Sequence, residues 1–465
     1  PQSTDVLVIK YLAGKGTLFA KEKIIHSYPH CYRCDTPLLY YALPSWFVNI
    51  QKVKENLLEK AKTMNWIPEH LKEGRFKNIM ENAPDWTISR NRFWASPLPI
   101  WKSESGKMMF VNSLEDLKKK TKKSGNKYFV MRHGQADNNT KRIVSSKINS
   151  GIHLTDEGKK QVQEEMKKIK DINFDYVFVS PLERTKETFD LLKTELNFAD
   201  SIIKIDEKIS EINAGEFEGK SIAEYNANFT GELERFTKKL KDAECLNDVK
   251  KRVADFLQNL ENTYKSKNIL IISHGDPIWM MNAVASGMTT KELEIKFLEG
   301  NYPRNAEFKE LDFVPLPHNA NYELDMHRPY IDAITLVDDE GTEYKRIPEV
   351  IDCWFESGSM PFAQDHYPFE RPDWKETNFP AGFVAEYIAQ TRTWFYYTHA
   401  ISTILFDHAP FENVVTTGTV LAEDGSKMSK SKDNFPDPWI LFDKYGVDAL
   451  RFYLMSSPLM KGEDV

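Results

Sequence analysis

The sequence is poor in cysteine, lacks long apolar runs and carries no excess of positive charge. Four cysteines among 465 residues exclude a disulfide scaffold and suit a reducing compartment. Apolar runs such as Ile269 to Ile272 suit buried strands, and they fall far below the ~20 residues that cross a bilayer. The opening Pro-Gln-Ser-Thr-Asp-Val offers neither a basic start nor an apolar signal segment. We therefore predict a cytoplasmic protein with no membrane partner.

The overall charge is acidic. A formal net charge of −7 argues against a generally basic nucleic-acid binder, although a local patch can still contact phosphates. The densest basic patch runs from Lys118 to Lys123. We interpret it as a solvated helix end and hinge, with a nucleic-acid contact as the alternative.

The length exceeds what a single hydrophobic core serves, so two or three domains are expected. Apolar residues make up 41% and charged residues 28%, which is typical of a globular protein. The lysine run ends in the flexible breaker Ser124-Gly125-Asn126. A second boundary falls at Pro315-Leu316-Pro317-His318, after which the sequence is again rich in tryptophan, phenylalanine and proline. The predicted segments are 1–123, 124–317 and 318–465.

The middle segment alternates between strands and helices. Residues 127–131, 175–179 and 268–273 read as buried strands. Thr155 reads as the N-cap of one helix, and another helix begins at about Pro181. This alternation predicts an α/β fold with a mostly parallel sheet and helices on both faces.

Two histidines follow strands of this predicted sheet. His133 and His274 would both emerge at the carboxyl edge, where open α/β folds bind ligands, so both can converge on one phosphate. A neutral histidine nitrogen can attack phosphorus and form a phosphohistidine. Arg132 and Arg184 can clamp the phosphate oxygens, and Arg184 stands in the first turn of a helix, where anions are favoured.

Four motifs in order resemble the histidine phosphatase (phosphoglycerate mutase-like) superfamily over residues 126–316. They are Arg132 to Gln135, Ser180 to Thr188, Glu211 to Gly219, and Ser273 to Gly275. The resemblance implies a three-layer α/β domain without a cofactor. It also makes Glu211 the proton donor and Asn139 a phosphate contact, whereas Arg142 falls one residue short of the usual spacing. The phosphorylated substrate is not readable from these residues.

Lys427 and Lys430 stand three residues apart in a polar loop after a predicted strand, Asn413 to Leu421. Mobile point charges of this kind can move with a departing pyrophosphate. In this context the stretch from Lys427 to Ser431 resembles the ATP-handling loop of class I aminoacyl-tRNA synthetases. We also predict a helix near Asp448.

The outer segments resemble isoleucyl-tRNA synthetases in three further places, residues 26–37, 86–94 and 352–362. The resemblance implies part of a Rossmann-like core, with ATP and Mg²⁺, isoleucine and tRNA(Ile) as substrates. Trp354 and Trp394 would wall the isoleucine pocket, Glu386 would meet the aminoacyl-adenylate, and Gln390 would lie nearby. Core packing is the alternative for each tryptophan.

The first segment carries three other signals. Val6 to Lys15 predicts a helix, and Leu38 to Tyr41 an aromatic strand. The stretch from Asn65 to Trp101 is dense in tryptophan and proline, and we expect loops that line a pocket. Cys31 and Cys34 have the spacing of half a zinc site. Its other ligands would come from outside the chain or from His26 and His30; otherwise no metal binds.

Departures from the synthetase pattern qualify this interpretation. The family's His-x-Gly-His signature does not occur, and Glu386 to Gln390 reads Glu-Tyr-Ile-Ala-Gln where many relatives have Glu-Gly-x-Asp-Gln. We therefore expect activation to need a complementing N-terminal portion. The second zinc knuckle of some relatives is replaced by residues 102–105 and 338–341, on either side of the phosphatase-like block.

The leading interpretation is a segment of an isoleucyl-tRNA synthetase carrying an inserted histidine phosphatase domain. One alternative is an autonomous phosphohydrolase that uses synthetase remnants to bind tRNA or as a scaffold. A third is a chain with two inactive pockets that only mediates assembly.

Overall fold

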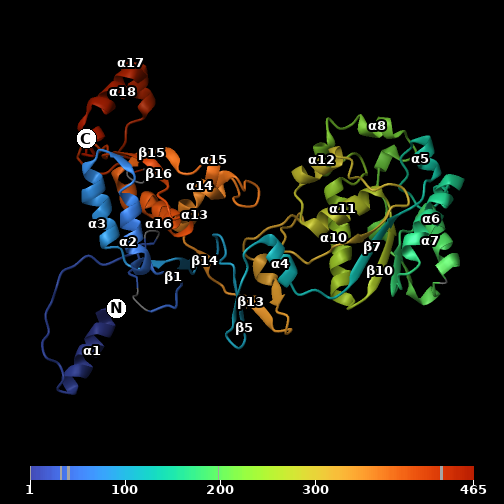
Figure 1. Cartoon of the computed structure of the whole chain (residues 1–465), viewed down its shortest axis with the longest axis horizontal. Coiled ribbons are helices and arrows are strands. Elements are labelled where there is room, and N and C mark those ends of the chain that lie inside the picture. Colours follow the sequence, from blue (N-terminus) through green and yellow to red (C-terminus); the bar gives the residue numbers. More distant parts are fainter. Residues whose placement is uncertain (1, 32–33, 39–41, 197, 430–432) are drawn as a thin grey trace.

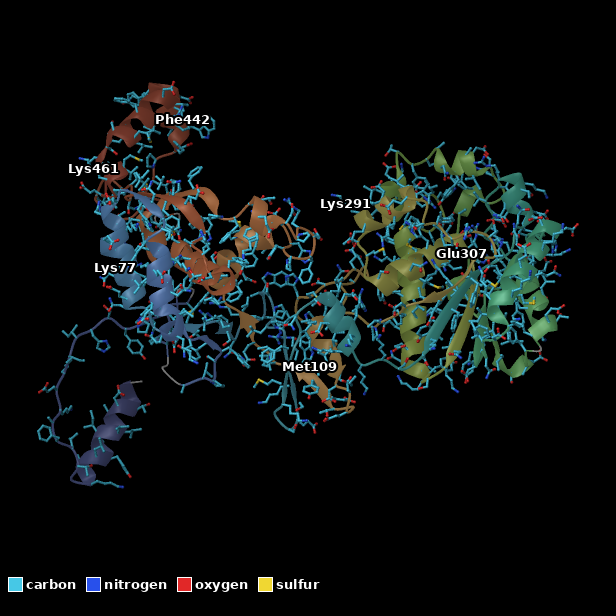
Figure 2. The ribbon with its side chains drawn as sticks, viewed as in Figure 1. Lys77, Met109, Lys291, Glu307, Phe442 and Lys461 are labelled. Carbon is cyan, nitrogen blue, oxygen red and sulfur yellow. The ribbon has the colours of Figure 1, made fainter. Side chains whose placement is uncertain are left out.

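Three bodies follow one another along the molecule (Figure 1) in the computed structural model, which describes all residues except 1, 32–33, 39–41, 197 and 430–432. One end combines elements from the two outer parts of the sequence, and the other end is built from the middle of the chain. A small sheet lies between them. In Figure 2, Met109 marks this small sheet and Glu307 marks the unit formed by the middle of the chain.

The middle of the chain forms a five-stranded sheet of order β11-β7-β10-β8-β9. Its strands are β7 (Lys127–Arg132), β8 (Tyr176–Val179), β9 (Ile203–Ile205), β10 (Asn268–Ser273) and β11 (Phe308–Leu311). All neighbours are parallel except β11, which pairs antiparallel with β7 at one edge. The sheet is therefore mostly parallel, as predicted.

Helices cover both faces of this sheet. On one face lie α6 (Asp156–Ile169) and α7 (Glu183–Leu196), and on the other α10 (Leu246–Thr263) and α11 (Gly275–Ser286). Alternate residues of β7 serve the two faces: Tyr128 and Val130 join the cluster with α10 and α11, whereas Phe129 and Met131 join the cluster with α6 and α7. This period of two in an apolar strand produces the three-layer α/β arrangement.

Shorter helices complete the unit (Figure 1). They are α5 (Asp137–Lys141), α8 (Ile222–Asn226), α9 (Glu232–Thr237) and α12 (Thr290–Leu298). Residues of all four line one cavity together with Arg132, the last residue of β7. They therefore form the cover of the sheet's carboxyl edge.

The small central sheet joins sequence from before and after this unit. Its antiparallel order is β12-β13-β5-β6, with strands β5 (Ile100–Ser103), β6 (Met108–Phe110), β12 (Thr335–Val337) and β13 (Glu343–Arg346). Helix α4 (Leu114–Lys120) contains the start of the predicted lysine run. Lys122 N then donates to Thr335 O at 2.9 Å, so the chain leaves and re-enters the sheet at neighbouring points. We propose these points as the junctions of an inserted domain.

The remaining body contains a three-stranded parallel sheet of order β15-β16-β2, formed by β15 (Ala381–Tyr387), β16 (Phe411–Thr417) and β2 (Asn65–Ile67). Helices α2 (Ile50–Ala61) and α16 (Trp394–Phe406) pack into the same core. Further elements are β1 (Phe47–Val48), β14 (Val350–Ile351), α13 (Cys353–Gly358), α14 (Met360–Ala363) and α15 (Trp374–Thr377).

One expectation about this body is wrong. The stretch from Asn65 to Trp101 is not a set of pocket-lining loops, because it contains β2, α3 (Lys77–Glu81), β3 (Trp86–Thr87) and β4 (Ser89–Arg90). Trp66, Trp86 and Trp101 are all buried in hydrophobic clusters. Strands of two or three residues are too short to show the alternation of apolar and polar residues that identifies a strand. The prediction of loops therefore rested on the proline and tryptophan content alone.

The helices near the two ends of the chain pack little against the rest of the molecule. Helix α1 (Gln2–Gly14), close to the predicted position, stands apart from the rest in Figure 1. At the other end, α17 (Pro438–Tyr445) and α18 (Val447–Ser456) bury none of their residues. The predicted strand at Leu38 to Tyr41 falls largely outside the described residues. Across the described helices, none is both long enough and apolar enough to cross a membrane.

Candidate active sites

The two predicted catalytic strands lie side by side. Ser273 at the end of β10 is the register partner of Arg132 at the end of β7, so the next residues, His274 and His133, leave the sheet together. Their ring centroids are 5.2 Å apart, and both side chains are buried. The structure therefore brings the two histidines to one point at the carboxyl edge.

The environment of His133 fixes its protonation. Its Nδ1 lies 2.7 Å from Gly134 O, which can only accept a hydrogen bond, so Nδ1 carries the proton. Arg184 Nε donates to His133 Nε2 at 3.1 Å. Burial, followed by the charges of Arg184 and Arg132, holds the pKa of His133 well below its ordinary value. The imidazole is thus neutral, with its lone pair on Nε2, which is the form that attacks phosphorus.

Three buried nitrogens around His133 have no hydrogen-bond partner in the described part of the chain. They are Arg132 Nε, Arg184 Nη1 and His274 Nδ1. The other atoms of these groups are engaged: Arg132 Nη1 donates to Pro303 O at 2.7 Å, and Arg184 Nη2 donates to Ser145 O at 3.0 Å. His274 Nε2 lies 2.7 Å from Ser180 Oγ; when that hydroxyl donates, Nδ1 carries the proton. An unpaired buried donor costs about 1–3 kcal/mol, so the cluster is complementary to an anion with several oxygens.

Two further predicted residues face the same cavity. Asn139 Oδ1 accepts from Ala136 N at 2.9 Å and from Asn305 Nδ2 at 3.2 Å, which leaves the side-chain amide N–H groups available. Glu211 is partly buried, and its Oε1 accepts from Ile212 N at 3.0 Å. Burial, reinforced by the charge of Asp276, raises the pKa of Glu211 to about 7. Glu211 therefore holds a proton near neutral pH, as a leaving-group acid must.

The cavity has a volume of about 300 Å³. Its lining combines residues of the predicted phosphate site with an outer wall of apolar, polar and charged side chains. It is lined by Arg132, Asn138, Asn139, Ile143, Val144, Ser145, Glu211, Ile212, Ile222, Tyr225, Asn226, Arg235, Asp276, Phe297 and Tyr302. Arg142, which falls one residue short of the family's usual spacing, is exposed and does not line this cavity.

Backbone packing explains two motif residues. A Cβ on Gly134 would lie 2.5 Å from Gly158 O, so only glycine lets the strand end approach the start of α6. Thr188 Oγ1 accepts from Gly134 N at 3.2 Å and donates to Arg184 O at 2.7 Å. Thr188 thus connects the segment bearing His133 with the helix bearing Arg184.

Sequence reasoning missed Asp276, Arg235 and Tyr302. Asp276 lies directly after the Ser-His-Gly motif, and its position there was the available signal. Arg235 and Tyr302 come from α9 and from the loop after α12, which no motif marked.

On the synthetase side, Trp354 and Trp394 come from neighbouring helices and are partly buried. Trp394 Nε1, in α16, donates to Ser357 O in α13 at 2.9 Å. Trp354 stacks on Tyr397 with ring centroids 5.6 Å apart. Their place beside a packed aromatic core is compatible with both the pocket-wall and the core-packing interpretation.

The other synthetase residues are arranged differently. Gln390 Oε1 accepts from Thr393 Oγ1 at 2.6 Å and from Trp394 N at 3.2 Å, so it caps the start of α16. Glu386 is exposed on β15. Lys427 Nζ lies 5.4 Å from the ring centroid of Tyr387, the residue that follows Glu386 and ends β15. The loop that carries Lys427 therefore lies beside the end of β15. Lys430 lies outside the described residues.

Asp352 connects two of the segments that resemble synthetases, residues 86–94 and 352–362, and was not singled out from sequence. It is 2% exposed, it pairs with Arg90 Nη2 at 2.9 Å, and it accepts from Trp86 Nε1 at 3.1 Å. A buried carboxylate with these partners fixes β4 against the start of α13.

The predicted zinc half-site offers two thiols only. Within the described residues, no group of three possible metal ligands occurs. Cys34 Sγ lies 3.2 Å from Thr36 Oγ1, and the Nδ1 atoms of His26 and His30 lie 2.9 Å from Ser27 O and Tyr28 O. Cys31 and Cys34 alone therefore do not fit a closed tetrahedral zinc site.

Two family models match the chain. The histidine phosphatase superfamily (branch 1) matches residues 128–304, which include the strand ends that carry His133 and His274. The class I tRNA synthetases for isoleucine, leucine, methionine and valine match residues 6–191 and 308–465. The chain belongs to the class I tRNA synthetase family and contains a histidine phosphatase domain. Residues 128–191 fall in both matches, and in the structure their strands and helices lie in the five-stranded unit.

Isoleucine–tRNA ligases are among the similar curated proteins. That of Wolbachia sp. subsp. Brugia malayi is 29% identical over 463 residues, covering 99% of this chain and 24% of the relative. That of Bifidobacterium longum is 30% identical over 455 residues, covering 96% of this chain and 24% of the relative. The chain thus spans about a quarter of the length of these relatives.

Solved structures match part of the chain. The mycobacterial glucosyl-3-phosphoglycerate phosphatase Rv2419c is 18% identical, with a TM-score of 0.35, over 40% of this chain and 91% of its own. YhfR of Bacillus stearothermophilus is 17% identical, with a TM-score of 0.33, over 47% of this chain and 95% of its own.

Proposed function

We propose that the chain is a segment of an isoleucine–tRNA ligase that carries a phosphohistidine-type phosphatase. The ligase part is supported by membership of the synthetase family and by isoleucine–tRNA ligases that match almost the whole chain. This coverage favours the proposal over an autonomous phosphohydrolase built on synthetase remnants. The phosphatase part is supported above all by the three unpaired buried nitrogens around a neutral His133.

The phosphatase reaction follows from these groups. His133 Nε2 attacks phosphorus, and an N–P bond forms as the bond from phosphorus to the leaving oxygen breaks. Glu211 gives its proton to that oxygen. Arg132, Arg184 and His274 donate to the phosphoryl oxygens, with Asn139 at the rim. Water then attacks phosphorus and returns a proton to Glu211, the N–P bond breaks, and inorganic phosphate leaves. No cofactor is needed for either step.

The ligase reaction uses ATP with Mg²⁺, isoleucine and tRNA(Ile) as substrates. The isoleucine carboxylate attacks the α-phosphate of ATP and pyrophosphate departs; the tRNA hydroxyl then attacks the adenylate carbonyl. We assign Lys427, together with Lys430, to the departing pyrophosphate. Trp354 and Trp394 are assigned to the wall of the isoleucine pocket, and Glu386 to the adenylate. Gln390 is assigned a supporting position, because its oxygen caps the helix that bears Trp394.

The exposed edge of β15 supports the proposal of a complementing N-terminal portion. β15 is an outer strand of a three-stranded parallel sheet, and Phe383 on it is 68% exposed. An outer strand offers backbone N–H and C=O groups that can pair with a further strand. A segment bearing the His-x-Gly-His signature, in a longer chain or a second subunit, would extend this sheet next to Glu386 and the loop of Lys427.

Two finer points stay proposals. Zinc at Cys31 and Cys34 requires ligands from another segment of protein. The cytoplasm is the proposed compartment, because none of the four cysteines forms a disulfide.

The test of the phosphatase part is hydrolysis of an aryl phosphate by the wild-type chain, His133→Ala and His153→Ala. His153 is an exposed histidine of the same unit that does not line the cavity. We expect loss of activity only in His133→Ala. Equal activity in all three proteins would contradict the proposed nucleophile.

The ligase part is tested by isoleucine-dependent exchange of pyrophosphate into ATP, with a complementing portion containing His-x-Gly-His added. We expect exchange that Lys427→Ala reduces. Exchange unaffected by Lys427→Ala would refute the assigned role, and no exchange in the complemented protein would refute the ligase proposal.

A further inference from the structure

The outer wall of the phosphatase cavity carries two carboxyl groups, those of Asp276 and Glu211. Asp276 lines it and is 6% exposed. Glu211 lines it beside Asp276, whose charge contributes to its raised pKa. The cation on this side, Arg235, is already shared by two carboxylates: Nη2 lies 3.2 Å from Asp276 Oδ2, and Nη1 lies 2.8 Å from Glu232 Oε2.

The charged residues leave no net positive charge for a second phosphate. Among the described lining residues the cations are Arg132 and Arg235, and Arg184 lies buried beneath. Arg132 and Arg184 are needed for the phosphoryl group that His133 attacks. Beyond them, the positive charge of Arg235 is neutralised by its ion pairs with Asp276 in the lining and with Glu232 outside it, so the leaving-group side offers no net positive charge even with Glu211 protonated.

Asp276 is held in place from several sides. Tyr302 Oη donates to Asp276 Oδ1 at 2.9 Å. A Cβ on Gly275 would lie 2.2 Å from that same Tyr302 oxygen, so glycine at this position is what lets Tyr302 reach the carboxylate. Asp276 also stands in the first turn of α11, where the helix dipole stabilises a negative charge. The carboxylate is therefore a built feature of the cavity wall.

The rest of this side suits a small uncharged group. Ile143, Ile212, Ile222 and Phe297 supply apolar surface in a cavity of about 300 Å³, and Tyr225 and Asn226 add uncharged polar groups. Arg235 Nε is buried without a partner and can donate to one hydroxyl oxygen.

We propose, on the basis of the proposed phosphatase function, that the cavity selects monoesters of small uncharged alcohols and rejects substrates whose leaving group carries a further phosphate, with Asp276 as the specificity-determining residue. In such a monoester the N–P bond to His133 forms while the bond to the alcohol oxygen breaks, and the alcohol leaves with the proton of Glu211. A phosphate-bearing leaving group would place its negative charge against Asp276.

The test compares phenyl phosphate with pyrophosphate at one pH, 6, as a ratio of kcat/KM values. Pyrophosphate is the smaller molecule, so a difference reports charge and not size. We expect the wild type to favour phenyl phosphate by about 100-fold. Asp276→Asn should reduce this preference about tenfold, because it removes one negative charge that repels the charged leaving group in a partly buried site. The matched control is Asp255→Asn, which also removes a carboxylate bonded to a tyrosine, Tyr322, but on an exposed surface of α10. Its ratio should equal that of the wild type.

A second variant keeps the test informative if Asp276→Asn does not fold. Ile222→Lys adds a cation to the same wall and should also shift the preference toward pyrophosphate. Equal hydrolysis of both substrates by the wild type, or an unchanged ratio in the folded Asp276 and Ile222 variants, would overturn the specificity proposal alone. Absence of phenyl phosphate hydrolysis in the wild type would overturn the proposed phosphatase and this inference with it.

Discussion

Replacing Glu211 by glutamine should slow hydrolysis most for esters with poor leaving groups. The pKa of Glu211 is raised from 4.5 to about 7, with burial as the main cause and Asp276 as the second; Arg184, Arg132 and the N–H of Ile212 oppose the shift. A shift of that size corresponds to roughly 3 kcal/mol against the carboxylate form. The proton is therefore present below pH 7 and is lost above it.

The assay follows kcat/KM from pH 5.5 to 9 for an alkyl phosphate and for p-nitrophenyl phosphate. For the alkyl ester the wild-type rate should fall about tenfold per unit above pH 7, and Glu211→Gln should lose about 10²–10⁴-fold at pH 6. The nitrophenolate leaves without a proton, so the loss for that ester should be far smaller. The second ionisation of the ester, near pH 6, affects wild type and variant alike and cancels in their ratio. Equal losses for the two esters, or a flat wild-type profile above pH 7, would refute the assignment of Glu211 as the acid.

Three other changes have defined outcomes. Gly134→Ala places a Cβ 2.5 Å from Gly158 O and should destabilise the protein by about 1–3 kcal/mol in urea unfolding. Gly74→Ala lies in a helical segment with open space around it and should not destabilise the protein. His399 is buried beside Leu57 O, and burial lowers its pKa from 6.5 to about 4. The unfolded state therefore binds the extra proton, and stability should fall by up to roughly 3 kcal/mol as the pH is lowered from 6.5 to 4. His399→Gln should flatten this pH dependence, and an unchanged pH dependence in the variant would assign it to another group. Trp394→Phe removes the 2.9 Å hydrogen bond to Ser357 O and should raise the KM for isoleucine in the complemented exchange assay; an unchanged KM would support core packing as its role.

The five-stranded unit was readable from sequence because its signals are local. The buried strand at residues 268–273 matches β10 residue for residue, since an isoleucine-rich apolar run too short for a helix favours a strand. Thr155 caps α6 as expected, accepting from Gly158 N at 3.0 Å, because a cap depends only on its own helix start. Two histidines placed directly after parallel strands had to meet at one edge.

The parts that were missed depend on contacts between distant segments. Asp276, Arg235 and Tyr302 gather from three elements, and no spacing in the sequence brings them together. Asp352 acquires its role only through Arg90 and Trp86, about 260 positions earlier. Gln390 matched a motif, but its oxygen is committed to the start of α16, which a motif comparison does not reveal.

The most direct test of the central claim is to quench the chain during turnover of a labelled phosphate ester and to locate the bound phosphoryl group. The account predicts an acid-labile, base-stable phosphohistidine at His133 in the wild type, and none in His133→Ala. A phosphoryl group at another residue, or hydrolysis that proceeds with no phosphoenzyme in either protein, would contradict it.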